Sequence, residues 1–208
     1  PFLQHENSNE PQIILMAGLQ GVGKTTTARI ISKAINCNKH FEHGVQRNNE
    51  VYCECDDITK SKHIDVLEMD AASKTGVDDI RDLLESSKYH PSVAKYKVFI
   101  IDEAHMLSKQ AFNALLKTLE EPPDHLKFIL ATTEIKKIPI TILSRCQRFD
   151  LKRIKIEEMI KFLTDISNKE DIKIDNNAIQ LIAKSSEGSV RDALSILDQA
   201  NITNIEKD

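Results

Sequence analysis

The sequence predicts an α/β fold built on a parallel sheet, followed by a small helical domain. Short apolar runs of strand length alternate with segments of helical periodicity over most of the chain. These runs lack polar alternation, which is typical of parallel strands that are buried on both faces. After about Leu151 the strand-like runs stop and helical patterns continue alone. We therefore predict a first domain over residues 1–153 and a second over residues 154–208.

Each predicted strand is a short apolar run, and helical segments fill the intervals. The strands are expected at Ile13–Met16, Ile64–Glu68, Lys97–Ile101, Lys127–Ala131 and, with a weaker pattern, Arg148–Leu151. The helices of the first domain are expected at Lys24–Ala34, Val77–Tyr89, Lys109–Leu119 and Pro139–Arg145. Those of the second domain are expected at Ile156–Ser167, Asn176–Ser186 and Ser189–Ala200, the last with an apolar stripe at helical spacing.

The composition is ordinary for a soluble globular protein, with 40% hydrophobic and 29% charged residues among 208. No apolar run reaches the length of a membrane span, so no membrane contact is expected. The four cysteines do not form a disulfide framework and the polar start is not a signal peptide, which together predict a cytoplasmic protein. At a net charge of −4, any contact with nucleic acid must come from a local surface.

The segment Gly18–Thr25 fits the phosphate-binding pattern G-x-x-x-x-G-K-[ST] and stands between a predicted strand and a predicted helix. In this context the glycines let backbone N–H groups and a helix N-terminus surround a polyphosphate. Lys24 is expected to reach the β- and γ-phosphates, and the Thr25 hydroxyl to hold Mg²⁺. The residues assigned to nucleotide binding here are Gly18, Gly21, Val22, Gly23, Lys24, Thr25 and Thr26.

A second motif is the apolar strand Val98–Ile101 followed by Asp102 and Glu103, the Walker B arrangement. Asp102 is expected to share the Mg²⁺ held by Thr25, and Glu103 to orient or deprotonate the attacking water. The pair Thr132-Thr133 follows another strand, at the sheet edge where ligands bind in open α/β folds. One of these hydroxyls contacts the γ-phosphate or the water, or else the pair only ends the strand.

Two arginines, Arg145 and Arg191, could each have a structural or a functional role. Arg145 ends a predicted helix and either makes surface ion pairs or acts as a finger that completes a neighbouring subunit's site. Arg191 opens the last helix and either reaches the bound nucleotide or pairs with Asp192.

A resemblance to a known family rests on segments that are spread over nearly the whole chain, namely Gly18–Thr25, Asp70–Ser73, Ile101–Leu107, Phe112–Pro123, Ala131–Thr133 and Ile142–Cys146. In these the chain resembles the gamma/tau subunits of the bacterial DNA polymerase III clamp loader. The resemblance implies an AAA+ P-loop ATPase domain with a five-stranded parallel sheet, then a three-helix lid. It also implies sensor 1 at Thr133, with Thr132 as the neighbouring candidate, an arginine finger at Arg145 and sensor 2 at Arg191.

The function implied by this resemblance is ATP hydrolysis with Mg²⁺ that drives loading of a sliding clamp onto primed DNA. The implied partners are other clamp-loader subunits, the sliding clamp and primer–template DNA, in a hetero-oligomer. Because the chain starts at Pro1, we expect a fragment without the family's adenine-contacting segment and oligomer-forming collar, largely monomeric by itself.

Two other functions are considered. A non-hydrolysing structural clamp-loader subunit is expected to lack residues that are present here, namely Lys24, Thr25, Asp102 and Glu103. Another AAA+ DNA motor, such as a branch-migration ATPase, is disfavoured by the Ser144–Cys146 motif and by the cysteine-bearing insertion.

The family also carries a zinc module with one cysteine after the first helix and a later C-x-x-C-x-x-C group. Cys37 and Cys55 match its first and last positions, but Cys53 breaks the spacing. Zinc bound near residues 37–63 by Cys37, Cys53 and Cys55 is one interpretation, and a degenerate module without metal is the other. The candidates for a fourth ligand are His40, His43 and His63.

Overall fold

The computed structural model describes residues 11–37, 55–73 and 76–205, with the side chains of residues 55–56 and 203–205 outside this description. By their contacts the described residues form two compact units. The first contains β1 and residues 25–149, and the second contains Gly18–Lys24 together with the residues from Asp150 onward. The domain boundary at residue 153 that the sequence suggests stays a prediction.

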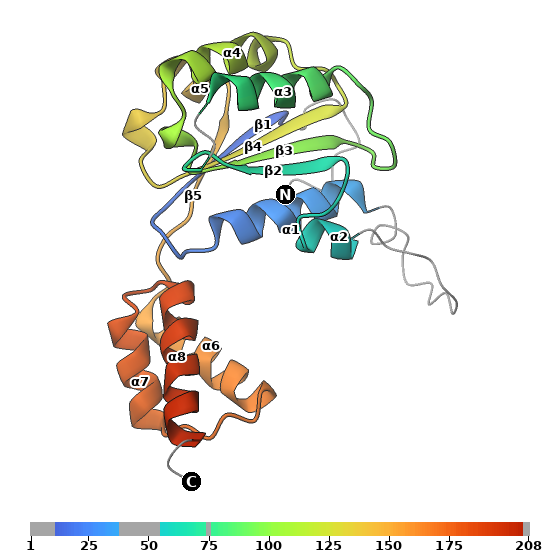
Figure 1. Ribbon diagram of the computed structural model, residues 1–208. Coiled ribbons are helices and arrows are strands. Elements are labelled where there is room, and N and C mark those ends of the chain that lie inside the picture. Colours follow the sequence, from blue (N-terminus) through green and yellow to red (C-terminus); the bar gives the residue numbers. More distant parts are fainter. Residues whose placement is uncertain (1–10, 38–54, 74–75, 206–208) are drawn as a thin grey trace, which may run out of the picture. The chain divides into compact units, whose positions relative to one another are not determined.

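The first unit is built on a sheet whose strands, in the described part of the chain, are β1 (Ile13–Ala17), β2 (Val66–Asp70), β3 (Lys97–Asp102), β4 (Leu126–Thr132) and β5 (Gln147–Asp150). The strand order is β2-β3-β4-β1-β5. The pairs β2–β3, β3–β4 and β1–β4 are parallel. The prediction of a five-stranded parallel α/β sheet is therefore confirmed (Figure 1).

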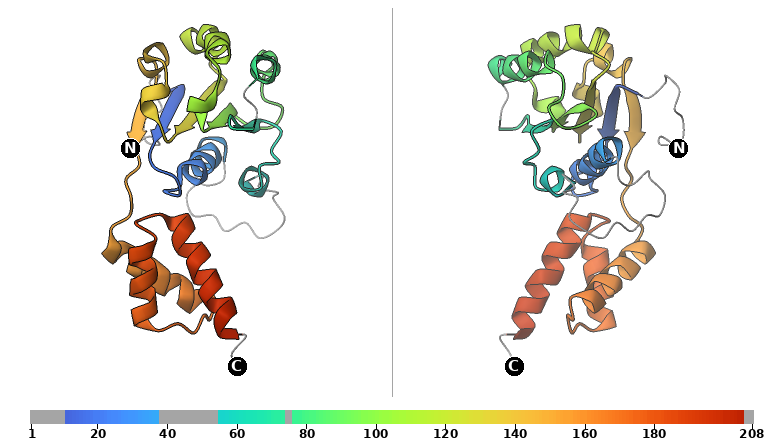
Figure 2. Two further views of the ribbon diagram at one scale, coloured as in Figure 1. Left: turned by 60° about the vertical axis from the view of Figure 1, so that its left-hand side comes forward. Right: turned by 90° about the vertical axis from the view of Figure 1, so that its right-hand side faces the viewer.

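Helices lie on both faces of this sheet, as Figures 1 and 2 show. On one face lie α3 (Val77–Ser87), α4 (Lys109–Glu120) and α5 (Ile140–Leu143). On the other lie α1 (Lys24–Asn36) and α2 (Cys55–Thr59). Short 3₁₀ turns, η1 (Ala104–Met106) and η2 (Ile135–Lys137), follow β3 and β4. Double coverage explains why β1 and β4 are buried at every position and read as unbroken apolar runs.

The core of this unit lies between the central strands and the helices α3 and α4. Phe99 of β3 and Phe128 of β4 are neighbours in the sheet register and meet edge to face, with ring centroids 5.4 Å apart. Leu115 of α4 and Ile80 of α3 are fully buried in the same core. Burying side chains of this size contributes about 1.5–3 kcal/mol each to the stability of the fold. The sheet therefore holds the loops at its edges in defined positions.

Strand β2 differs from its prediction, because it starts at Val66 and not at Ile64. Ile64 is 65% exposed, whereas the side chain of the next residue, Asp65, is buried. The Asp65 carboxylate accepts backbone N–H groups from Ser92, Val93 and Ala94 at 2.8, 2.8 and 3.0 Å. Asp65 therefore closes the loop that leads into β3, and the ladder begins after it.

Helix lengths also differ from the predictions at several ends. Helix α5 has four residues, Ile140–Leu143, because the chain turns at Ser144 and Arg145 toward β5. Helix α3 ends at Ser87, before the loop anchored by Asp65. Helix α2 was not expected from the sequence, since five residues are too few for a clear periodicity.

The second unit contains the helices α6 (Ile156–Lys169), α7 (Asn176–Ser185) and α8 (Val190–Ile205), in agreement with the predicted helical lid. Their shared core consists of Met159, Leu163, Ile179, Ile182, Ala183, Ala193 and Leu197. The described part of α8 extends beyond Ala200, where the sequence prediction ended.

Among the described helices, none has both the length and the apolar character that crossing a membrane requires.

The Asp65 anchor generates a prediction about stability. Burial opposes ionisation of this carboxyl, but the three backbone N–H donors outweigh it and hold the pKa of Asp65 below its ordinary value. A group with a lowered folded-state pKa stabilises the fold above its unfolded-state pKa. The stabilisation is therefore complete well above about pH 4 and fades as the pH falls toward the folded-state pKa.

We expect Asp65→Ala to lower the free energy of unfolding by about 1–3 kcal/mol at pH 7, because it removes the acceptor of three backbone N–H groups. Urea unfolding at pH 7 and at pH 3 measures this, and the difference between wild type and variant should shrink at the lower pH. The control is Asp124→Asn on an exposed loop, which should change stability by less than about 0.5 kcal/mol. An Asp65→Ala variant as stable as the wild type at pH 7 would contradict the anchoring role.

Candidate functional site

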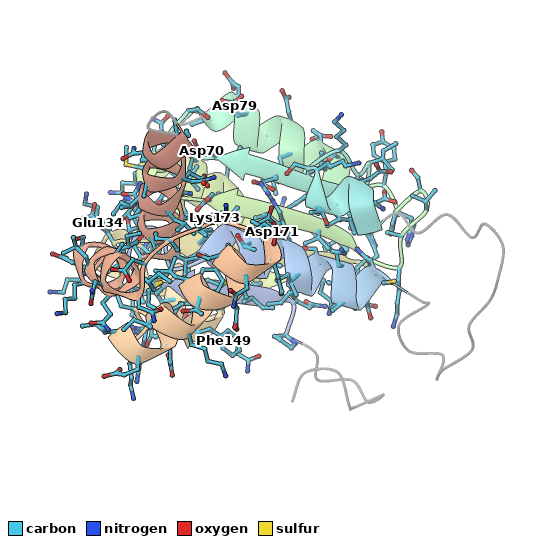
Figure 3. The ribbon with its side chains drawn as sticks, turned by 90° about the horizontal axis from the view of Figure 1, so that it is seen from below. Asp70, Asp79, Glu134, Phe149, Asp171 and Lys173 are labelled. Atoms are coloured by element: carbon cyan, nitrogen blue, oxygen red, sulfur yellow. The ribbon has the colours of Figure 1, made fainter. Side chains whose placement is uncertain are left out.

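Several predicted site residues gather at the carboxyl edge of the sheet. Strand β3 ends at Asp102 and β4 ends at Thr132, and the parallel register sets Asp70 beside Asp102 and Ala17 beside Thr132. Figure 3 labels Asp70, the last residue of β2, and Glu134, which follows β4. The carboxyl ends of these parallel strands thus meet at one edge, where ligands bind in open α/β folds.

Thr25 and Asp102, predicted to share a magnesium ion, are in contact. The Thr25 hydroxyl, in the first turn of α1, donates a hydrogen bond to Oδ2 of Asp102. The other carboxylate oxygen of Asp102 accepts the backbone N–H of Glu103 at 2.8 Å. A hydroxyl and a carboxylate side by side are hard oxygen donors of the kind that Mg²⁺ takes, so this pair fits the predicted ion.

Glu103 has an unusual backbone and a well-defined carboxylate. Its φ of 45° and ψ of 44° are left-handed, a conformation that costs a non-glycine residue on the order of 1 kcal/mol and is common at functional sites. The Thr133 hydroxyl donates to Oε2 of Glu103 at 3.0 Å. The structure therefore brings together the predicted water-activating carboxylate and the predicted sensor hydroxyl.

Thr132, the alternative sensor, has a different environment. Its side chain is fully buried, and its Oγ1 lies 3.1 Å from Nδ1 of His105 and accepts the Glu134 N–H at 3.1 Å. Of the two threonines, Thr133 is therefore the one next to Glu103. The contact of His105 with Thr132 was not expected from the sequence, although His105 stands only two residues after Glu103 in the quoted motif.

Helix α1 is also tied to strand β2 by an ion pair that sequence reasoning missed. Arg29 donates Nε–H and Nη2–H to the two carboxylate oxygens of Glu68, at 2.8 and 2.7 Å. The hydrogen bonds from Arg29 and Ser61 hold the pKa of Glu68 below its ordinary value, against the effect of burial. This two-point contact fixes the helix that carries Thr25 and Thr26. The side chain of Thr26 is exposed.

The phosphate-binding loop, residues 18–24, has the backbone that its glycines predict. Gly21 and Gly23 have φ of 77° and 90°, values that residues other than glycine rarely adopt. The Lys24 side chain is buried, and its Nζ donates to the carbonyl oxygen of Leu19 at 3.1 Å. The lysine side chain thus lies along its own loop. Val22 stands in this loop between the two glycines.

Within the second unit, this loop contacts the N-terminus of α8. The carbonyl oxygen of Gly21 accepts the backbone N–H groups of Val190 at 3.1 Å and of Arg191 at 3.5 Å. A Cβ atom on Gly21 would come too close to Oγ of Ser189, and the positive φ at Gly21 also favours glycine. The predicted sensor 2 residue therefore has its backbone at the phosphate-binding loop.

Arg145 makes the surface ion pair that the sequence left as one of its two interpretations. Its Nη2 lies 2.8 Å from Oε1 of Glu120, the last residue of α4, and its Nη1 donates to the carbonyl oxygen of Thr141. Arg145 is exposed, and its role toward a neighbouring subunit stays a prediction.

The predicted zinc ligands fall mostly outside the described residues. Cys37 is buried just after α1, Cys53, His40 and His43 are not described, and Cys55 is described only as the first residue of α2. In the described part of the chain, no group of three or more histidine, cysteine or acidic residues is placed to hold a metal ion. Zinc binding stays a prediction.

Comparison with known proteins identifies the family. Residues 3–155 match the family model described as DNA polymerase III, delta subunit, and residues 158–203 match that of the DNA polymerase III clamp loader subunit ATPase lid domain. The chain belongs to this family of DNA polymerase III clamp-loader proteins. The resemblance derived from the motifs is thereby confirmed.

Among its clamp-loader relatives, the chain is 49% identical over 187 residues to DNA polymerase III subunit tau of Escherichia coli K12. It is 51% identical over 187 residues to subunit tau of Bacillus subtilis 168, and 46% identical over 187 residues to subunit gamma of Buchnera aphidicola from Acyrthosiphon pisum. Each alignment covers 89% of this chain. The chain spans 28%, 32% and 51% of the lengths of these three relatives.

Solved structures support the AAA+ fold. The RuvB Holliday junction branch migration motor of Thermotoga maritima matches with a TM-score of 0.63 and 22% identity, over 90% of this chain and 53% of that one. A DNA polymerase III gamma subunit-related protein of Thermotoga maritima matches with a TM-score of 0.60 and 23% identity, over 92% of this chain and 54% of that one. At such identities the likeness concerns the fold alone.

Cys146 of the Ser144–Cys146 motif generates a prediction about reactivity. Burial raises the pKa of the Cys146 thiol to about 11, and the thiol donates to the carbonyl oxygen of Ile142 at 3.1 Å. Since the thiolate is the reactive form, alkylation of Cys146 at pH 8 should be roughly two orders of magnitude slower than in the unfolded chain. Mass spectrometry of the peptide that contains Cys146, after timed iodoacetamide treatment with and without urea, measures this. Equal rates in the two conditions would contradict the prediction.

Proposed function

We propose that this chain is the ATP-hydrolysing part of a bacterial DNA polymerase III clamp-loader subunit. The observation that carries the proposal is the contact of Thr25 with Asp102 beside the contact of Glu103 with Thr133. A metal-binding pair and a water-activating pair on adjacent strand ends are the parts that phosphoryl transfer needs. The names of the relatives, which are tau and gamma subunits, support the same assignment.

In this proposal the phosphate-binding loop and Lys24 hold the ATP phosphates. Backbone N–H groups of Gly21, Val22 and Gly23 face the polyphosphate, and Lys24 exchanges the carbonyl oxygen of Leu19 for phosphate oxygens. The exchange replaces a neutral acceptor with a charged one, which forms the stronger hydrogen bond. Gly18 and Thr26 lie at the two ends of this proposed phosphate-binding segment.

Thr25 and Asp102 would hold Mg²⁺, which supplies charge neutralisation on the phosphates. Glu103 accepts a proton from the attacking water at its carboxylate, and Thr133 donates its hydroxyl to the γ-phosphate or to that water. The hydrogen bond from the backbone N–H of Glu103 to Asp102 fixes the Glu103 backbone beside the metal-binding carboxylate. Arg191 acts as the sensor 2 residue on the nucleotide.

Arg145 completes the site of an adjacent subunit in this proposal. The pairing with Glu120 then holds the guanidinium until a γ-phosphate of the neighbour replaces the carboxylate. Both partners are oxyanions, so Nη2 of Arg145 exchanges one charged acceptor for another.

The partners in this proposal are other clamp-loader subunits, a sliding clamp and primer–template DNA, and the location is the cytoplasm, where bacterial DNA is replicated. A non-hydrolysing role is not favoured, since Lys24, Thr25, Asp102 and Glu103 are all present. A branch-migration motor shares the fold, but the tau and gamma relatives are far more similar in sequence.

The proposal predicts that binding and turnover of ATP separate in two variants of the full-length protein. Lys24→Ala loses a charge-assisted contact, so ATP affinity should fall at least about tenfold. Glu103→Gln keeps its size but loses the proton acceptor, so it should bind ATP normally and hydrolyse it about 10²–10⁴ times more slowly. Isothermal titration and a DNA-stimulated ATPase assay, with and without a sliding clamp, measure the two effects. Normal turnover by Glu103→Gln would exclude it as the base.

The trans role of Arg145 is tested by mixing two inactive variants in the assembled full-length complex. Arg145→Ala should bind ATP normally and hydrolyse it on the order of 10³–10⁵ times more slowly, the cost of losing an arginine finger. Mixing it with Lys24→Ala should restore part of the activity, because each variant damages a different half of a shared site. The control is Arg81→Ala on the exposed face of α3, which should hydrolyse ATP normally. Weakened ATP binding by isolated Arg145→Ala would instead place the residue in its own subunit's site.

A further inference from the structure

His105 is buried beside Glu103, and the proposed reaction gives it no role. Its side chain is 6% exposed. Its Nδ1 lies 3.4 Å from Oε2 of Glu103, and its Nε2 lies 3.5 Å from Oε1 of Glu134. The imidazole therefore stands between two carboxylates, one of which is the proposed proton acceptor.

Thr133 and His105 both lie at Oε2 of Glu103, and the Thr133 hydroxyl is needed elsewhere. Thr133 donates its hydroxyl proton to this oxygen at 3.0 Å, and the His105 ring lies against the same oxygen. A hydroxyl has one proton to donate. When Thr133 turns that proton to a γ-phosphate or to the attacking water, its bond to Glu103 is lost. Nδ1 of His105, at 3.4 Å, then remains beside the same carboxylate oxygen.

The backbone of Glu103 cannot replace this contact. Its left-handed conformation and its N–H bond to Asp102 fix where the side chain begins, but the carboxylate lies beyond three rotatable bonds. Ordering a side chain of this length costs up to about 2 kcal/mol, so an adjacent contact is needed to hold the carboxylate in one orientation. A carboxylate displaced by about 1 Å from the attacking water is a poor base.

His105 is itself rigidly supported. Its Nδ1 lies 3.1 Å from Oγ1 of Thr132, a residue that is 0% exposed at the end of β4. The same oxygen accepts the backbone N–H of Glu134 at 3.1 Å, which fixes the start of the loop after β4. Glu134 is held in turn by Lys137, at 2.8 Å. A buried ring packed on a strand end is the kind of second layer that keeps a reacting group in place.

We propose that His105 is a positioning residue for ATP hydrolysis, which keeps the Glu103 carboxylate aligned when Thr133 engages the nucleotide. The inference rests on the proposed function, in which Glu103 is the base. His105 does not touch the substrate in this proposal and acts only through Glu103. Its loss should therefore lower kcat and leave ATP affinity unchanged.

The test compares three substitutions of His105 in the full-length protein. His105→Ala should lower kcat about 10- to 100-fold, with the dissociation constant for ATP unchanged within about twofold. His105→Asn places an amide N–H near the position of Nδ1 and should restore most of kcat, whereas His105→Gln places it near Nε2 and should not. The control is His90→Ala, which should hydrolyse ATP normally, because His90 is exposed and its ring lies tilted against that of His125.

A double variant and a spectroscopic measurement distinguish positioning from a merely structural role. In the Glu103→Gln background, His105→Ala should cause no further loss of turnover, because the effect passes through Glu103. The imidazole NMR resonances of His105, assigned by their loss in His105→Asn, should shift in Glu103→Gln, while those of His125 should not.

The outcomes separate this inference from the function on which it rests. Normal turnover by Glu103→Gln removes the proposed base and the inference with it. An inactive Glu103→Gln with a fully active His105→Ala overturns only the role of His105. Equal kcat values for His105→Asn and His105→Gln, or a further loss in the double variant, also overturn it, whatever the melting temperature of His105→Ala.

Discussion

The carboxylate of Asp102 fixes how the first helix, the third strand and the turn after that strand meet. One of its oxygens accepts the Thr25 hydroxyl from the first turn of α1, and the other accepts the backbone N–H of Glu103. The second bond accompanies the left-handed backbone of Glu103. Because a carboxylate oxygen accepts more than one partner, Asp102 can brace the fold and still offer oxygen to a metal ion.

The sheet makes this arrangement possible by bringing strand ends together. The central strands are buried on both faces, and their parallel pairing aligns the ends of β2, β3 and β4 at one edge. Helix α1 is held against the sheet twice, at the edge by Thr25 on Asp102 and within β2 by Arg29 on Glu68. The polar groups of the candidate site are thus spread over segments that are far apart in the chain, and the buried strands bring them together.

Local motifs predicted the fold and much of the candidate site. The phosphate-binding loop and the Walker B strand each lie within one short segment. Their residue types and spacing were therefore sufficient to predict both motifs. The boundary of β2 was misplaced because Ile64 looks like a strand residue, whereas the neighbouring Asp65 is buried to close a distant loop. Residues that act through contacts across the sheet, such as Glu68, had no local signal that could reveal them.

The sequence by itself determined the alternation of strands and helices along most of the chain, the glycine positions of the phosphate-binding loop and the family to which the chain belongs. Hydrophobic periodicity and motif spacing are local properties, so they can be recognised in the sequence without a structure. Only the tertiary structure decided which of two adjacent threonines meets Glu103, that His105 lies beneath the same carboxylate, and that Arg145 pairs with Glu120. These contacts join residues from different elements, and their geometry depends on how the strands align and where each strand ends.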